Sequence, residues 1–346
     1  MTLNRRLILE ILAFVVVVLL IVVFMARRAG GPGRYDDHRL MMGTVVGVTV
    51  FAPGEGEANE AMEAAFDEVR RVEELASRYI ETSLISRWNA RTAPADTIDP
   101  EIAAVVARAL VVAELSKGAF DPTIAPVVDL WDFEAGARVP DEDEVRAALV
   151  DVDYAFVDVR TNEGVVAAPI DTELDLDGII KGYAVDRAVE VLREAGIEAA
   201  IVDAGGDVGF LGASPTGPAW RVGVKHPRRD GLIGVLAVEG GSVATSGDYQ
   251  RFIEVDGVRY HHLIDPETGY PARSLSSATV WTRSALDADA LATAVFVMGP
   301  EDGIALAERL DEIEALVVTA DGEVLGTEGA VERFTRAEDE EEDDGP

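Results

Sequence analysis

Predicted hairpins and helices follow one another irregularly along this chain, and that order restricts its fold more than any other feature. Hairpins are expected over 154–168, 251–264 and 315–327, where alternating apolar runs meet at turn residues. Helical periodicity covers 57–79, 100–118, 178–196 and 284–300. This pattern lacks the regular strand–helix alternation of a doubly wound parallel sheet. It therefore predicts an α+β fold with largely antiparallel or mixed sheets flanked by helices.

The N-terminal residues differ in composition from the rest of the chain. After a short flank at 1–6, residues 7–26 form an apolar run that is interrupted only by Glu10 and is long enough to span a bilayer. Arg27 and Arg28 follow without a small-residue cleavage site, so we expect a transmembrane signal anchor rather than a cleaved signal peptide. Residues 27–37 are predicted to be a linker, 38–335 a single domain, and 336–346 an acidic disordered tail.

The balance of charged residues limits the possible partners. The chain has 30 Lys and Arg residues against 64 Asp and Glu residues, which gives a formal net charge of −34. Nucleic acid is therefore not an expected partner, because phosphate binding needs a basic face. There is no cysteine, which excludes disulfides, thiolate metal sites and a thiol nucleophile. Salt adaptation and acidic tails combined with GC-rich coding explain this composition equally well.

The last long helical segment contains a possible metal site. Asp289 and Thr293 are four residues apart and share one helix face, whereas Asp287 points elsewhere and suits a capping role with Ser284. A carboxylate and a hydroxyl on one face can hold a hard divalent cation such as magnesium. The same spacing more often gives only a polar stripe, so the pattern alone does not establish a metal site.

A second constellation lies in the stretch "ELDLDGIIKGYAVD". Gly178 and Gly182 allow the backbone to approach a ligand closely, and they flank Lys181, one of only three lysines in the chain. A helix that begins here offers free amides and the positive end of its dipole to a phosphate. The simpler alternative is an ordinary strand-to-helix turn with a surface lysine.

Two other glycine-containing stretches bear on which kind of ligand site to expect. The paired glycines of "VDAGGDVG" do not form a GxGxxG pattern and no helical pattern follows them, so a Rossmann-type dinucleotide fold is not expected. Phe120 and Asp121 follow a predicted helix end at Gly118. Aromatic residues in such a position can line a ring pocket, although they more often belong to the core.

Two of the four histidines, His261 and His262, are adjacent. On a strand their side chains face opposite sides, so the two cannot serve one site together. One of them is expected to transfer a proton or to position a phosphate, while the other packs or faces solvent. For either histidine taken alone, a structural role is the more common one.

Taken in order, eight stretches resemble the ApbE-type FAD:protein FMN transferases. They are "MGTVVGV", "SRYIETSLISRWN", "GAFDPTIAPVVDLWDF", "LDLDGIIKGYAVD", "VDAGGDVG", "ATSGDYQRF", "YHHLIDPETGYP" and "DADALATAVFVMG". The resemblance implies an enzyme that binds FAD and a divalent cation, usually magnesium. It implies cleavage of the FAD pyrophosphate, transfer of FMN to a Thr or Ser hydroxyl of a target protein as a phosphoester, and release of AMP. Common targets are subunits of membrane redox complexes and other extracytoplasmic electron carriers.

The resemblance also assigns roles to individual residues. It places the metal on the side chains of Asp289 and Thr293 and on the backbone carbonyl of Gly178, and it assigns catalysis to His262. The implied FAD contacts are Met42, Tyr79, Ala119, Phe120, Asp121, Asp175, Lys181 and Ile264. The chain departs from the family at Asp177, where a glycine is common, and this extra carboxylate either assists the metal or faces water.

Two other activities remain compatible with the same residues. Water could replace the acceptor, which would make the protein an FAD pyrophosphatase, or the protein could be a flavin carrier without turnover. The expected location is the cell membrane, with a single N-terminal anchor and the domain outside the cytoplasm. The flanking positive charges do not decide the orientation of the anchor in the membrane, because Arg5 and Arg6 on one side of the apolar run match Arg27 and Arg28 on the other.

Overall fold

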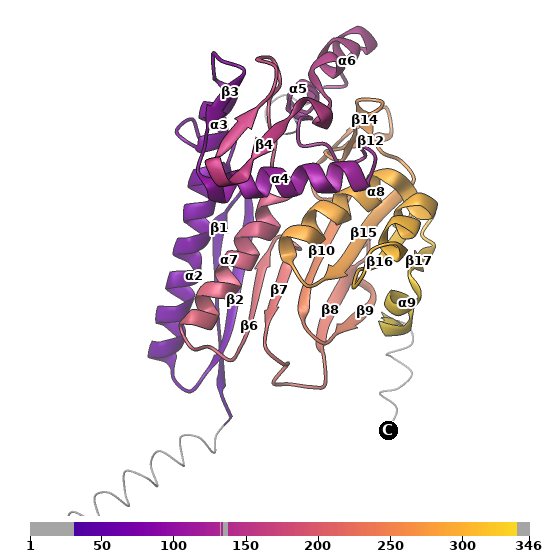
Figure 1. The fold of residues 1–346 in the computed structure, drawn as a ribbon. Coiled ribbons are helices and arrows are strands. Elements are labelled where there is room, and N and C mark those ends of the chain that lie inside the picture. Colours follow the sequence, from indigo (N-terminus) through magenta and orange to yellow (C-terminus); the bar gives the residue numbers. More distant parts are fainter. Residues whose placement is uncertain (1–30, 132, 134–137, 338–346) are drawn as a thin grey trace, which may run out of the picture.

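An eight-stranded antiparallel sheet forms the centre of the computed structural model, which describes residues 31–131, 133 and 138–337 (Figure 1). Its strand order is β1-β2-β6-β7-β10-β15-β16-β17. The strands are β1 (Gly33–Met41), β2 (Thr44–Ala52), β6 (Ala199–Ala204), β7 (Val208–Leu211), β10 (Gly241–Gly247), β15 (Leu275–Thr282), β16 (Glu314–Thr319) and β17 (Val324–Gly326).

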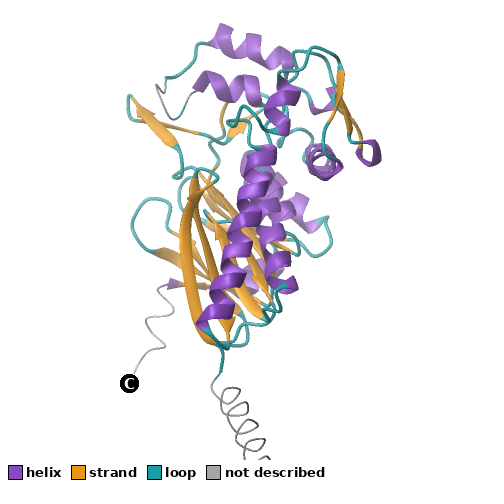
Figure 2. Cartoon of the chain, turned by 90° about the vertical axis from the view of Figure 1, so that its left-hand side faces the viewer, coloured by secondary structure: helices purple, strands orange, loops and turns teal. Residues whose placement is uncertain are grey.

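Three helices cover one face of this sheet (Figures 1 and 2). They are α2 (Glu55–Ala76), α7 (Ile180–Glu194) and α8 (Ala285–Glu308). In α2, small and apolar residues recur at helical spacing and are buried, namely Ala58, Ala61, Met62, Ala65, Phe66, Val69 and Val72. The backbone of α8 breaks at Gly299, whose φ is 83°, and Pro300 starts its second segment.

A smaller antiparallel sheet covers the opposite face. It has the order β18-β9-β8 and consists of β8 (Trp220–Lys225), β9 (Leu232–Val238) and β18 (Phe334–Arg336), preceded by helix α9 (Glu328–Arg333). Trp220 stacks on Phe210 of β7 with ring centroids 5.2 Å apart, and Phe51 of β2 lies 6.1 Å from Trp220. Because both faces of the main sheet are covered, a central strand such as β15 is buried along nearly its whole length.

A cap of short elements covers one end of the main sheet (Figure 1). It contains α3 (Leu84–Asn89), α4 (Pro100–Leu115), α5 (Ala125–Trp131), α6 (Glu142–Ala148), the sheet of β3 (Ala95–Thr97), β5 (Val165–Ala167) and β4 (Asp158–Arg160), and the 3-10 helices η1 (Leu149–Asp151), η2 (Tyr154–Phe156) and η3 (Thr161–Glu163). Two hairpins complete this end, β11 (Phe252–Val255) with β12 (Val258–His261) and β13 (Ile264–Asp265) with β14 (Tyr270–Pro271). Trp131 of α5 joins cap and hairpins, with ring centroids 5.5 Å from both Tyr260 and Tyr270.

The predicted α+β class with antiparallel sheets and flanking helices is confirmed. The hairpins expected over 154–168, 251–264 and 315–327 correspond to β4–β5, β11–β12 and β16–β17. The turn of the second hairpin has positive φ at Asp256 (53°) and Gly257 (76°), as a tight two-residue turn requires.

The beginning of the domain differs from the prediction. Strand β1 starts at Gly33, so residues 33–37 of the predicted linker belong to the main sheet, where they pair with β2. Most β1 side chains are exposed, and backbone pairing rather than apolar alternation holds this edge strand. The predicted transmembrane segment at 7–26 and nearly all of the predicted acidic tail lie outside the described residues. Within the described part, α8 alone is long and apolar enough to cross a membrane, and it packs in the core.

Candidate active site

A cavity of about 390 Å³ opens between the cap and the end of the main sheet. The N-terminal parts of α7 and α8, the turn after β6, the end of β10 and the segment after β12 all contribute to its wall. Eleven of the twelve predicted site residues line it: Tyr79, Ala119, Phe120, Asp121, Asp175, Gly178, Lys181, His262, Ile264, Asp289 and Thr293. Segments far apart in the sequence therefore meet at one cavity.

Lys181 stands at the centre of the charged groups. Its Nζ lies 2.8 Å from Asp207 Oδ2 and 3.1 Å from Asp289 Oδ1. Burial opposes the charge on Lys181, but the two carboxylates outweigh this effect and raise its pKa. Burial also raises the pKa of Asp207, and the charge of Asp289 acts in the same direction. With all three groups charged, the cluster has an excess of negative charge that a bound cation would offset.

Asp289 is held in place by the start of α7. The backbone N–H of Gly182 donates to Asp289 Oδ2 over 3.0 Å, so the carboxylate caps the positive end of that helix. This contact requires a glycine at 182, because an added Cβ would lie 2.1 Å from the carbonyl oxygen of Ala285 and 2.8 Å from Asp289 Cβ. The small residue thus allows α7 and α8 to approach closely enough for Asp289 to meet Lys181.

The three predicted metal ligands lie together at the same wall. An added Cβ on Gly178 would be 3.6 Å from Thr293 Oγ1, which places the 178 backbone beside that hydroxyl. Thr293 Oγ1 is also 3.2 Å from Ser246 Oγ. Carboxylate, hydroxyl and carbonyl oxygens are hard donors, and this chemistry fits Mg²⁺. Of these three groups, only Asp289 is a carboxylate. Across the described residues, no three His, Cys, Asp or Glu side chains form a metal-binding group.

A second acidic group also lines the cavity. Asp175 is buried and faces Arg78, whose Nη1 is 3.7 Å from Asp175 Oδ2, while Arg78 Nη2 donates to both oxygens of Asp129 at 2.8 Å. Burial raises the pKa of Asp175, and the charge of Asp177 adds to this effect. Asp177, the departure from the family pattern, lines the cavity. Tyr79 is 62% exposed and lies at its rim.

The loop after α4 supplies an aromatic wall. Phe120 is 5% exposed and its ring would lie 3.0 Å from a Cβ on Gly178, so this residue both packs in the core and lines the cavity. Asp121 accepts hydrogen bonds from the backbone N–H and hydroxyl of Thr123 and from the N–H of Tyr154. Burial raises the pKa of Asp121. Its carboxylate therefore fixes the loop that forms this part of the cavity wall.

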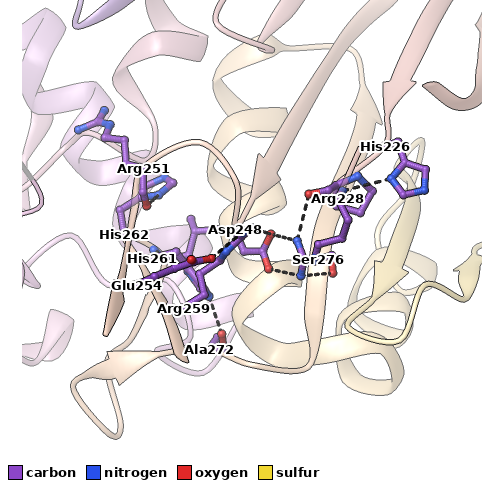
Figure 3. Close-up of polar contacts among 12 residues, drawn as sticks. His226, Arg228, Asp248, Arg251, Glu254, Arg259, His261, His262, Ala272 and Ser276 are labelled. Atoms are coloured by element: carbon purple, nitrogen blue, oxygen red, sulfur yellow. Dashed lines mark hydrogen bonds and ion pairs between the residues drawn. The ribbon is translucent and has the colours of Figure 1, made fainter. Parts of the chain in front are cut away.

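The two adjacent histidines occupy different environments (Figure 3). His261 is 3% exposed, and its Nε2 lies 2.7 Å from the carbonyl oxygen of Ala272, away from the cavity. His262 lines the cavity, and its Nδ1 lies 3.3 Å from the carbonyl oxygen of Arg251. Because a carbonyl only accepts, the proton of His262 sits on Nδ1 and leaves Nε2 free to accept one. Burial, with a contribution from Arg251, lowers the pKa of His262 to about 3.

Met42 is the predicted site residue that the structure does not bring to the cavity wall. It occupies the β1–β2 turn with a φ of 52°, and its N–H donates to Glu73 Oε1. Asp207 is the functional candidate that the sequence analysis missed. It follows the paired glycines of "VDAGGDVG", and the position of an acidic residue directly after a glycine turn at a strand end was the available signal.

Comparison with known proteins gives consistent matches over most of the chain. The model of the ApbE family matches residues 42–317. An FAD:protein FMN transferase of Treponema pallidum is 36% identical over 88% of this chain and 90% of its own length, and one of Vibrio cholerae is 35% identical over 73% and 78%. Among solved structures, the ApbE protein of Thermotoga maritima is 34% identical with a TM-score of 0.81, covering 87% of this chain and 99% of that one. The apo flavinyl transferase ApbE of Pseudomonas stutzeri is 29% identical with a TM-score of 0.77, covering 88% and 98%.

Proposed function

The chain belongs to the ApbE family and is a transferase enzyme, and we propose that it moves FMN from FAD to a Thr or Ser hydroxyl of an acceptor protein. In this reaction the acceptor oxygen forms a bond to the FMN phosphorus, the bond from that phosphorus to the AMP oxygen breaks, and AMP leaves. The observation that supports this most strongly is the convergence of Lys181, Asp289, Thr293, Gly178 and His262 on one cavity. A volume of about 390 Å³ is within the usual range of ligand sites.

His262 is suited to accept the proton of the acceptor hydroxyl. Its Nδ1 is committed to the Arg251 carbonyl, so Nε2 is the free basic atom on the cavity side. The low pKa keeps the ring neutral before the substrate binds. An anionic pyrophosphate beside Nε2 would stabilise the protonated ring and so strengthen the base in the substrate complex.

Lys181 would bind the phosphate oxygens of FAD. Asp207 and Asp289 keep it charged and fix its Nζ at the cavity wall, at the N-terminus of α7. Asp289, Thr293 and the carbonyl of Gly178 are the groups that would hold Mg²⁺. When bound, the ion would supply positive charge that stabilises the charge developing on the phosphoryl and leaving-group oxygens.

The remaining walls suit the two ring systems of FAD. Phe120, Ile124, Val128, Phe133 and Ile264 give one side of the cavity an apolar surface. Flat apolar rings are favoured at such a surface because their burial removes apolar area from water. Tyr79 at the exposed rim would lie against whichever ring extends toward solvent.

The proposed cellular location and the proposed acceptor are based on the amino-acid sequence. The apolar run at 7–26 would anchor the domain in the cell membrane, with the domain outside the cytoplasm. The acceptor would be a flavoprotein subunit of a membrane redox complex or an extracytoplasmic electron carrier. Protease accessibility in intact cells tests the sidedness, since an extracytoplasmic domain is digested without lysis.

A transfer assay tests the activity. Purified protein is incubated with FAD, Mg²⁺ and a candidate acceptor, and the products are separated on a denaturing gel. We expect a fluorescent flavin band on the acceptor together with released AMP. Release of AMP without that band would indicate a pyrophosphatase, and bound FAD without AMP would indicate a carrier.

A further inference from the structure

A second hollow of about 310 Å³ lies next to the candidate active site, at the same end of the main sheet. The turn between β8 and β9 forms one side of it, and the turn between β16 and β17 forms another. Ser276, at the start of β15, and Arg336, in β18, complete the wall. The hollow is separate from the cavity described above, and no residue lines both.

Its charge is opposite to that of the chain as a whole. The described lining residues include His226, Arg228, Arg229 and Arg336, with Asp321 as the acidic one among them. Arg229 and Arg336 form no ion pair with any residue in the described ranges. The chain has 64 acidic and 30 basic residues, so a basic hollow is unusual on this surface.

The basic groups are partly fixed in position (Figure 3). Arg228 donates to both oxygens of Asp248 at 2.7 and 2.6 Å and to Ser276 Oγ at 2.9 Å. The N–H of Arg228 donates to His226 Nδ1 over 3.1 Å, so Nε2 of that ring holds the proton and is available as a donor. Burial lowers the pKa of His226, and so do the charges of Arg229 and Arg228, which is the effect of a positive local potential. Asp248 pairs with Arg228, and Asp321 is the one acidic side chain in the described lining against Arg229 and Arg336, so the lining has a net positive charge.

One short segment separates the hollow from the active site. Ser246, Gln250 and Arg251 line the first cavity, whereas Asp248 between them turns to the other side and binds Arg228. Tyr249 of the same segment lies 5.3 Å from Lys225 Nζ, just before the turn that lines the hollow. The same segment of chain therefore borders both the active-site cavity and the hollow.

We propose that this basic hollow is a docking site for a carboxylate-rich segment of the acceptor protein, an inference that rests on the proposed transferase function. Arg229 and Arg336 are exposed and open to the surface, which suits a protein segment better than a small ligand that needs enclosure. A chain with a net charge of −34 repels an acidic acceptor at long range, and a local basic site would hold the acceptor in the orientation that transfer requires.

Peptide binding tests the hollow independently of catalysis. Fluorescein-labelled hexaglutamate is titrated with the full chain at low ionic strength, with labelled hexaglutamine as the neutral control and fluorescence anisotropy as the readout. We expect the double variant Arg229→Gln/Arg336→Gln to bind hexaglutamate about 3- to 10-fold more weakly than the wild type. The difference should disappear in high salt, which screens exposed charges.

The matched control is Arg193→Gln/Arg283→Gln. Arg193 lies in the last turn of α7 and Arg283 directly follows β15, so this variant removes the same charge from exposed arginines at the other end of the sheet. Equal loss of peptide affinity in both double variants would overturn the proposal, because it would reflect net charge alone. Inorganic pyrophosphate that binds more tightly than hexaglutamate and loses that affinity in Arg229→Gln/Arg336→Gln would also overturn it, since the hollow would then be a small-anion site.

Transfer kinetics provide the second test, with an acceptor on which the wild type forms a covalent flavin adduct. We expect the Arg229→Gln/Arg336→Gln variant to raise KM for the acceptor about 3- to 10-fold, with kcat and the Kd for FAD unchanged. If the KM of this variant for the acceptor were unchanged, the docking site would be refuted and the transferase function would remain intact. Failure of the wild type to modify any candidate acceptor would instead refute the proposed function. Deletion of 338–346, whose residues are mostly Asp and Glu, should leave the effect in place; its disappearance would mean that this acidic run, not the acceptor, is the occupant.

Discussion

Replacement of Gly182 by alanine directly tests the close contact between α7 and α8 that positions the candidate site. The new Cβ would lie 2.1 Å from the carbonyl oxygen and 2.5 Å from the carbonyl carbon of Ala285. Both atoms belong to the backbone of the first turn of α8, so rotation of a side chain cannot relieve the contact. One helix must move away from the other by more than an ångström if an ordinary contact of about 3.4 Å is to be restored.

The expected destabilisation combines three effects. Overpacking of a tight contact costs about 1–3 kcal/mol. The movement would also strain Asp186 of α7, which accepts hydrogen bonds from Ser284 Oγ, the Ala285 N–H and the Leu286 N–H at 2.7 to 3.0 Å. Loss of such capping bonds costs roughly 1 kcal/mol or more. The higher helix propensity of alanine returns about 1 kcal/mol, so the free energy of unfolding should fall by about 1–3 kcal/mol in total.

Urea denaturation followed by tryptophan fluorescence measures this change, and the expected shift of the midpoint is on the order of 1 M. Gly56→Ala is the matched control, because Gly56 is also helical but has no atom within 4 Å of an added Cβ. That variant should be neutral or slightly more stable. If Gly182→Ala were as stable as Gly56→Ala, the close approach of α7 and α8 would not exist as described. The Gly182 variant should also bind FAD more weakly, because its Cβ would press on Asp289.

Further predictions concern the cavity itself. Asp289→Ala should lower turnover at limiting Mg²⁺ by at least about 100-fold; unchanged turnover in a magnesium titration would contradict its role as a ligand. His262→Ala should lower kcat by about 10²–10⁴-fold while FAD affinity, measured by flavin fluorescence, changes little; an equal fall in both would indicate a binding role. Since burial lowers the pKa of His262 to about 3, its ring should stay neutral in the free protein well below pH 6.5, and an NMR titration near 6.5 would refute this. The unfolded chain then takes up the proton first, so this histidine lowers the stability of the fold as the pH falls from about 6.5 toward 3.

Local structure was largely predictable because it depends on local chemistry. The turn at Asp256–Gly257 and the helix break at Gly299 both follow from residues that tolerate positive φ, and the structure has both. Ser284 is the predicted N-cap of α8. Asp287, in contrast, does not return to the cap but pairs with Arg108 of α4 at 2.6 Å. That partner lies far away in the sequence, so no local pattern could reveal it.

In the candidate site, too, local spacing predicts some features, whereas others depend on partners that only the fold brings together. The spacing of Asp289 and Thr293 places both on one helix face, but nothing in that spacing indicates Gly178 as a neighbour; only the family resemblance did. Asp207 was missed because its significance depends on Lys181, which the fold brings within 2.8 Å. Strand β1 was missed for a related reason, since an exposed edge strand is held by backbone pairing and needs no apolar alternation.

The most direct test of the central claim is the stoichiometry of AMP release and covalent flavin formation in a single reaction. Wild-type protein, FAD, Mg²⁺ and an acceptor are mixed, AMP is quantified by chromatography, and the acceptor is analysed by mass spectrometry. Transfer in the cavity around Lys181 and His262 predicts equal amounts of AMP and of FMN linked to a Thr or Ser hydroxyl. AMP in large excess over bound FMN, or FMN bound without AMP, would contradict the account.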